Sequence, residues 1–194
     1  QHICFTSTYM VYGKPETNPI KEEHQTNPIT VYGASKLSTE KFLQIFSKQH
    51  NIPVTILRFM GIYDLENPYN QAIPSFIKLI SNNQNPIILG NGHTKRNHLH
   101  VDDSINAILS CLKNKKSGIY NIGGSDIPSN LELIEIINKK MNKKIQPNFE
   151  NIDNKQHDFI TDISKAEKEL GFKPTISIEK GISKTIERFR KNPW

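Results

Sequence analysis

The sequence predicts an α/β fold with a mainly parallel β-sheet. Short runs rich in apolar and β-branched residues, such as 53–59 (PVTILRF), alternate along the chain with longer segments that carry apolar residues at helical spacing. Gly, Pro and capping residues separate these segments. Because such alternation is typical of sheets whose parallel strands are connected by helices, we expect this organisation here.

The chain opens with a short predicted strand and a long predicted helix. Residues 2–7 (HICFTS) form a short apolar run that suits a buried strand, and residues 32–50 have the length and periodicity of a helix. The β-branched residues of 53–59 then favour a second strand. The long helix offers four large apolar side chains for packing: Leu37, Phe42, Ile45 and Phe46.

The middle of the chain continues the alternation. In order, the predicted elements are a helix at 73–83, strands at 86–90 and 98–101, a helix at 102–114 and a strand at 118–124. Gly90 and Gly92 predict a hairpin turn between the two adjacent strands. Asp102 or Asp103 can cap the second helix or favour its N-terminus, and Asp102 is the preferred cap.

Two capping boxes mark helices in the last third of the chain. They pair Ser129 with Glu132 and Ser164 with Glu167, ahead of predicted helices at 131–141 and 165–170. Gly171 is expected to end the second of these helices, since glycine readily adopts the left-handed conformation of a helix C-terminus. A final helix is predicted over about 177–190.

Composition excludes several classes of protein. Apolar residues make up 36% of the chain, enough for a packed core, and no run approaches the ~18 apolar residues of a membrane span. No signal-peptide pattern is visible, and we expect a cytoplasmic protein in which Cys4 and Cys111 are buried thiols. The net charge of +6 comes mainly from lysine, without aromatic residues interleaved with arginine, so neither nucleic acid nor a membrane is an expected partner.

The tripeptide VYG occurs twice, and only one of its tyrosines suits acid–base chemistry. Tyr32 is followed at i+4 by Lys36, so the two side chains share one face of the predicted helix. A neighbouring ammonium lowers the pKa of a phenol from near 10 by about 1–3 units, which favours the phenolate as a base. Tyr12 has Glu16 at the same spacing, which would raise its pKa instead. Thr8 lies at the C-terminal end of a predicted strand, where sites form in open α/β sheets.

Segments in a defined order resemble the extended short-chain dehydrogenase/reductase family, specifically its nucleotide-sugar epimerases and dehydratases. The family's Ser/Thr-x-x-Val-Tyr-Gly element matches residues 8–13 (TYMVYG), and its Tyr-Gly-x-Ser-Lys element matches 32–36 (YGASK). Further matches follow in family order over nearly the whole chain: ILRF (56–59), IPSFI (73–77), GNGHTKRNHLHVDD (90–103), YNIGG (120–124) and DISKAEKELGFKP (162–174).

The resemblance implies a Rossmann-type doubly wound parallel sheet, here lacking its N-terminal strands, with a small α/β substrate-binding region. Residues 1–63 would be the C-terminal part of the NAD(P)-binding domain. Residues 64–194 would mainly bind substrate, with 98–125 returning to the Rossmann sheet. None of the ten glycines forms the family's glycine-rich dinucleotide loop, so we expect the chain to begin in mid-domain and to bind NAD at best very weakly.

The resemblance also implies roles for individual residues. Tyr32 takes a proton from a sugar hydroxyl as hydride leaves that carbon for a nicotinamide. Lys36 lowers the pKa of the tyrosine and holds the nicotinamide ribose, and Thr8 hydrogen-bonds the same sugar oxygen. Tyr32, Lys36 and Ser7 are the implied cofactor contacts.

Substrate contacts are implied for Arg96, Gly61 and Thr8. A guanidinium suits bidentate binding of a diphosphate, and a solvated arginine in a turn is the alternative for Arg96. Gly61 stands where many family members have asparagine. No metal site is expected, because the histidines within 93–100 fit a strand edge and no Cys or Glu completes a ligand set.

We therefore expect an NAD(P)-dependent nucleotide-sugar epimerase acting at C4 of a hexose, with NAD as cofactor and NADP as the alternative. The full-length protein is expected to form a homodimer. Dehydration is disfavoured because Tyr9 and Met10 occupy positions where 4,6-dehydratases place Asp and Glu. The alternatives are a 4-reductase or dehydratase of the same family, and a non-catalytic nucleotide-sensing relative, which would lose the Tyr–Lys pair.

Overall fold

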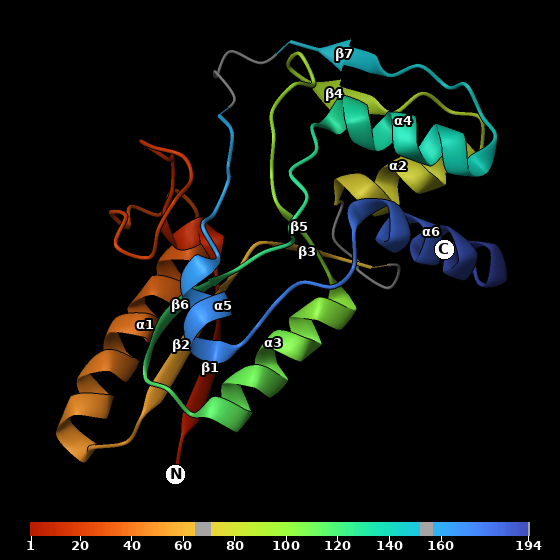
Figure 1. Ribbon diagram of the computed structural model, residues 1–194. Helices are drawn as coiled ribbons and strands as arrows, with labels where there is room; N and C mark the ends of the chain where they lie inside the picture. Colours follow the sequence, from red (N-terminus) through yellow and green to blue (C-terminus); the bar gives the residue numbers. More distant parts are fainter. Residues whose placement is uncertain (65–70, 152–156, 194) are drawn as a thin grey trace.

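Three parallel strands form the central sheet of the computed structural model, which describes residues 1–64, 71–151 and 157–193. In spatial order they are β1 (Ile3–Thr8), β2 (Val54–Phe59) and β6 (Gly118–Ile122). One face is covered by α1 (Val31–His50), and the other by α3 (Val101–Asn114) and α5 (Ser164–Leu170) (Figure 1). The predicted α/β class with parallel strands is thereby confirmed.

A second lobe, at the upper right of Figure 1, consists mainly of helices. Its helices are α2 (Ala72–Ser81), α4 (Asn130–Met141) and α6 (Ile178–Lys191). They share an apolar core to which Ile77, Leu133 and Ile182 contribute. Two small parallel sheets accompany them: β3 (Gly61–Tyr63) pairs with β5 (His98–His100), and β4 (Ile87–Leu89) pairs with β7 (Asn148–Glu150). None of the described helices is long and apolar enough to cross a bilayer.

The predicted hairpin around Gly90 and Gly92 is wrong. Both glycines have positive φ angles, 73° and 78°, and redirect the chain, but the strands on either side do not pair with each other. β4 pairs with β7, a strand some 60 residues further along that the sequence analysis did not predict. The intervening backbone instead bridges to two other segments, Lys95 to Ser129 and Arg96 to Phe159.

Of the two predicted capping boxes, only the first forms. The Ser129 N–H donates to a Glu132 carboxylate oxygen over 2.6 Å, and the Glu132 N–H donates to the Ser129 hydroxyl over 3.3 Å. Ser164 already belongs to α5, and its N–H donates to Asp162 Oδ1 over 2.9 Å. An aspartate two residues ahead thus takes the role predicted for Ser164. Gly171 ends α5 with a φ of 63°, as predicted.

The cap of α3 is His100, not Asp102. The His100 side chain accepts a hydrogen bond from the Asp102 N–H over 3.2 Å. The Asp102 carboxylate instead binds the Lys184 ammonium on α6. Asp103 accepts hydrogen bonds from the backbone N–H groups of Thr175 and Ile176. The acidic residues therefore connect α3 to the C-terminal segment rather than cap it, although their charges still suit the helix N-terminus.

The packing predicted for α1 is wrong for two of its four apolar residues. Phe42 and Ile45 are 65% and 58% exposed. The buried residues of the helix are Gly33 and Glu40 instead. A Cβ atom added at Gly33 would lie only 2.6 Å from the carbonyl oxygen of Met10, so the helix approaches that backbone more closely than any larger residue allows.

Gly33→Ala should therefore destabilise the protein by about 1–3 kcal/mol, the usual cost of overpacking. The free-energy cost of the clash has to exceed the stabilisation of about 1 kcal/mol that alanine gives a helix relative to glycine. Urea unfolding measures the difference. Gly61→Ala is the matched control, because a Cβ at Gly61 meets nothing within 4 Å. Equal losses in both variants would show that crowding at Met10 is not the reason for Gly33.

Candidate active site

The end of β1 and the start of α1 lie together. Thr8 ends the strand, and its hydroxyl accepts a hydrogen bond from the Met10 N–H (3.3 Å), which opens a short 3₁₀-helix, η1 (Tyr9–Val11). Thr30 caps α1 in the same way, by accepting from the Gly33 N–H over 3.0 Å. The close approach of Gly33 to Met10 then holds the first turn of α1 against η1. Local capping and one glycine thus bring Thr8 and the helix start into one region.

Tyr32 and Lys36 share one face of α1, as their spacing predicted. The Lys36 ammonium lies 5.8 Å from the centroid of the Tyr32 ring and 4.9 Å from that of Phe5. It donates a hydrogen bond to the carbonyl oxygen of Thr6 in β1 over 2.8 Å. The strand backbone therefore fixes the position of the lysine. Tyr32 is 53% exposed, so its phenol is accessible from solvent.

Tyr12, in the first VYG, has a different environment. Its side chain is 1% exposed, and its hydroxyl donates to Asn121 Oδ1 over 2.6 Å. The Arg58 guanidinium lies 4.7 Å from the centroid of its ring. Burial raises the pKa of Tyr12 to about 12, despite the lowering effect of Arg58. A buried phenol with that pKa cannot act as a base at neutral pH, and Tyr12 serves the structure.

A row of polar residues crosses the sheet beneath α1. Ser7, Arg58 and Asn121 are directly paired neighbours on β1, β2 and β6. Glu40 of α1 closes this row from above: its carboxylate accepts hydrogen bonds from Arg58 Nη2 (2.7 Å) and Nε (3.1 Å) and from the Ser7 hydroxyl (2.5 Å). The side chains of Arg58 and Glu40 are 2% and 1% exposed, so both charges are buried and each is neutralised by the other.

The sequence analysis missed this row, which includes the predicted cofactor contact Ser7. The sequence did contain a signal for this row. In each of β1, β2 and β6 the residue before the last one is polar, and these residues are Ser7, Arg58 and Asn121. Glu40 also follows Lys36 at i+4, on the same side of the helix. Only the register of the strands shows that these four groups meet.

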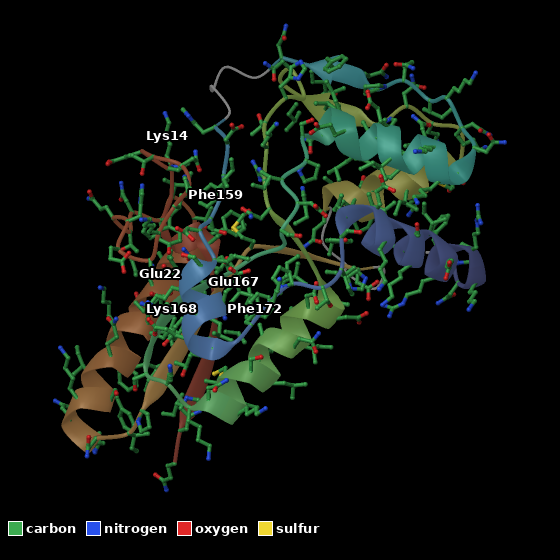
Figure 2. All side chains as sticks on the ribbon, in the orientation of Figure 1. Lys14, Glu22, Phe159, Glu167, Lys168 and Phe172 are labelled. Carbon is green, nitrogen blue, oxygen red and sulfur yellow. The ribbon has the colours of Figure 1, made fainter. Side chains whose placement is uncertain are left out.

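The loop before α1 is attached to the same row. The backbone carbonyl of Glu22 accepts a hydrogen bond from Arg58 Nη1 over 3.1 Å, and its carboxylate accepts one from the Asn121 N–H over 2.8 Å. Burial raises the pKa of Glu22. In Figure 2, Glu22 lies beside α5. The loop that leads to Tyr32 is therefore fixed to β2 and β6 as well as to α1.

Arg96 and Gly61 border the same strand ends. Arg96 is exposed, and its backbone bridges to Phe159, whose ring contacts that of Tyr9 at a centroid distance of 4.7 Å (Figure 2). Since Tyr9 follows Thr8 directly, this ring contact connects the backbone segment of Arg96 to the segment that carries Thr8. Gly61 begins β3 just after β2, with open space where a side chain would be.

The histidines of the β5 region serve the structure. Burial lowers the pKa of His98 to about 4, so its imidazole is neutral at physiological pH. His100 accepts the capping hydrogen bond of α3. Within residues 1–64, 71–151 and 157–193, no three His, Cys, Asp or Glu side chains gather as metal ligands would.

Comparison with known proteins gives the family. The family model described as GDP-mannose 4,6-dehydratase matches residues 1–185. The chain belongs to this family. Among curated proteins, it is 33% identical to a putative UDP-glucose 4-epimerase of Methanocaldococcus jannaschii, over 94% of this chain and 60% of that protein. It is also 33% identical to dTDP-4-dehydro-6-deoxyglucose reductase of Escherichia coli, over 98% of this chain and 62% of that protein. The chain thus spans about three fifths of the length of these family members.

Solved structures of nucleotide-sugar epimerases share the fold. UDP-glucuronic acid 4-epimerase from Bacillus cereus, in complex with NAD, superposes with a TM-score of 0.89 at 28% identity, covering 97% of this chain and 61% of that one. UDP-glucose 4-epimerase from Thermotoga maritima, with UDP-glucose, also gives 0.89, at 27% identity and 97% and 63% coverage. The predicted membership of the extended short-chain dehydrogenase/reductase family, with its Rossmann-type fold, is confirmed.

Proposed function

We propose that the protein is an NAD-dependent nucleotide-sugar epimerase that inverts C4 of a hexose. The observation that carries this proposal is the accessible phenol of Tyr32 beside a lysine whose ammonium is held by the β1 backbone. Relatives whose names state 4-epimerase activity support the choice of reaction. The 4-epimerase from Bacillus cereus, solved with NAD, supports the choice of cofactor, and NADP is the alternative.

In the proposed reaction, Tyr32 removes the proton from the C4 hydroxyl, and Thr8 hydrogen-bonds the same oxygen. A cation beside a phenol stabilises a phenolate electrostatically, and the Lys36 ammonium lies 5.8 Å from the centroid of the Tyr32 ring. After the C4 ketone has rotated to present its opposite face, Tyr32 returns the proton to the C4 oxygen. NAD, when bound, would accept hydride from C4 and return it to the opposite face of that carbon.

The residues around Lys36 fit a nicotinamide ribose. An ammonium has three donors, and the described part of the chain engages one of them, at Thr6. Two donors remain for ribose hydroxyls. Ser7, the third proposed cofactor contact, donates its own proton to Glu40, so it would meet a cofactor only as an acceptor. Arg96 and the open space at Gly61 are the proposed contacts of the nucleotide diphosphate.

A 4-keto reductase is the second candidate, because the Escherichia coli relative carries that name and the same tyrosine and lysine would serve it. Dehydration fits less well. Tyr9 packs its ring on Phe159, and neither Tyr9 nor Met10 offers the carboxyl group that eliminating water requires. We further propose a cytoplasmic homodimer, for which the exposed Phe42 and Ile45 of α1 offer apolar surface.

The test uses the protein at its full natural length with NAD and, in turn, UDP-glucose, UDP-glucuronic acid and dTDP-glucose. Proton NMR of the products separates the candidates. We expect inversion at C4 with no net change in NAD. Loss of water from the sugar would identify a dehydratase instead, and reduction of a 4-keto sugar with consumption of reduced cofactor would identify a reductase. Binding of a nucleotide sugar without any turnover would favour a non-catalytic relative.

A further inference from the structure

Residues 158–162 connect two parts of the candidate site that lie far apart in the sequence. This short segment, which we call the connecting segment, leads into α5 (Figure 1). On one side, Thr161 forms a parallel bridge with Ile20 in the loop before α1. On the other side, Phe159 forms a parallel bridge with Arg96. The connecting segment therefore lies between the loop that leads to α1 and the backbone of Arg96.

The residues on both sides of Arg96 are hydrogen-bonded to the connecting segment. Before it, the Lys95 N–H donates to Asp158 Oδ1 over 2.8 Å. After it, Asn97 Oδ1 accepts from the Thr161 N–H, also over 2.8 Å. Asn97 is buried, whereas Arg96 is exposed. The connecting segment thus fixes the backbone around Arg96 and leaves the side chain of the arginine accessible to a ligand.

The loop before α1 is attached to the other side of the connecting segment. The Asn18 side chain donates to the carbonyl of Asp158 over 3.0 Å and accepts from the Ile160 N–H over 2.9 Å. The Ile20 N–H donates to the Ile160 carbonyl over 2.7 Å, and the Ile20 carbonyl accepts from the Asp162 N–H over 2.8 Å. The loop that leads to α1 and the segment of the arginine are therefore held by the same five residues.

We propose that the connecting segment sets the position of Arg96 relative to Tyr32, with Asp158 as a positioning residue for the diphosphate of the substrate. This inference rests on the proposed function, in which Arg96 contacts the diphosphate and Tyr32 reacts at the sugar. Because both groups belong to one substrate molecule, the two side chains have to keep a matching separation. An arginine whose backbone is fixed before binding also loses less conformational freedom when it contacts the diphosphate.

Asp158 is the residue through which this role can be tested without disturbing the core. It is exposed, and its Oδ1 accepts from the residue directly before Arg96. Asp158→Ala removes this acceptor, and water can take its place at the Lys95 N–H. Arg96→Ala should weaken the binding of a nucleoside diphosphate by about 10–100-fold, the range for hydrogen bonds to a charged group. Asp158→Ala should weaken it by about 3–10-fold, the effect of having to order one long side chain on binding.

The experiment is a calorimetric titration of the protein at its full natural length, in the presence of NAD, with UDP and in parallel with dTDP. Asp158→Asn should restore the native affinity, because the amide oxygen can still accept from the Lys95 N–H. Asp162→Ala is the matched control. Asp162 Oδ1 accepts a backbone hydrogen bond from Ser164 over 2.9 Å at the other end of the connecting segment. This variant loses the same kind of bond away from Arg96, and it should bind as tightly as the native protein.

The double variant Arg96→Ala with Asp158→Ala separates positioning from a general loss of structure. Because Asp158 is proposed to act through Arg96, the double variant should bind no more weakly than Arg96→Ala alone. Additive losses, or native affinity in Asp158→Ala while Arg96→Ala is weakened, would overturn the positioning role and leave the proposed function standing. Native affinity in Arg96→Ala, or a native protein that binds neither nucleotide, would overturn the diphosphate contact and this inference together.

Discussion

Tyr32→Phe should lower turnover by about 10²–10⁴-fold, the range for the loss of a positioned acid–base group. The change removes the ionisable oxygen and keeps the ring. Because the phenol is half-exposed at the start of α1, no buried hydrogen bond is lost with it. Substrate affinity should change little, since most binding energy would come from nucleotide contacts remote from the reacting carbon. The absorbance of reduced nicotinamide in the full natural protein measures the hydride transfer.

Two further variants separate this role from a structural one. Lys36→Met should also slow turnover, because it removes the ammonium that lies beside the Tyr32 ring and is proposed to hold the nicotinamide ribose. Tyr12→Phe should leave turnover nearly intact and lower the free energy of unfolding by about 1 kcal/mol, because it removes the buried hydrogen bond to Asn121. If Tyr12→Phe abolished reduction and Tyr32→Phe did not, the two VYG stretches would have exchanged roles.

The elements near the candidate site could be predicted because their signals are local. The β-branched run of β2, the helical period of α1 and the spacing of Tyr32 and Lys36 are all properties of short windows. The capping box at Ser129 also formed, since both of its partners lie within one helical turn. Within such windows, neighbouring residues decide the structure.

The misses share a different origin, because each depends on residues far apart in the sequence. β4 does not pair with β5, the next strand in the sequence, because it pairs with β7, which lies some 60 residues later. Asp102 does not cap α3, because Lys184 of α6 takes its carboxylate. Phe42 was expected to be available for packing but is exposed, and Glu40 is buried on α1 instead because Arg58 lies opposite it. Tertiary partners override local preference at all three places.

The Arg58–Glu40 pair carries the largest stability effect expected in this fold. Arg58→Met should lower the free energy of unfolding by about 3–5 kcal/mol, because it leaves the carboxylate of Glu40 buried without its cation. Of the residues in the row, only Ser7 would still donate a hydrogen bond to this carboxylate, through its neutral hydroxyl. The carbonyl of Glu22 would lose its Arg58 donor as well, which loosens the loop that leads to Tyr32.

Urea unfolding measures the loss, and an exposed ion pair of the same protein provides the control. Lys140 and Glu179 lie 3.4 Å apart near the surface, so Glu179→Gln should cost at most about 1 kcal/mol. The double variant Arg58→Met with Glu40→Leu should recover much of the loss, since removing both charges leaves neither unpaired in the interior. If Arg58→Met lowered the free energy of unfolding no more than Glu179→Gln does, water would have to reach Glu40. In that case the row beneath α1 could not be what holds Tyr32 and Lys36 in position over the end of β1.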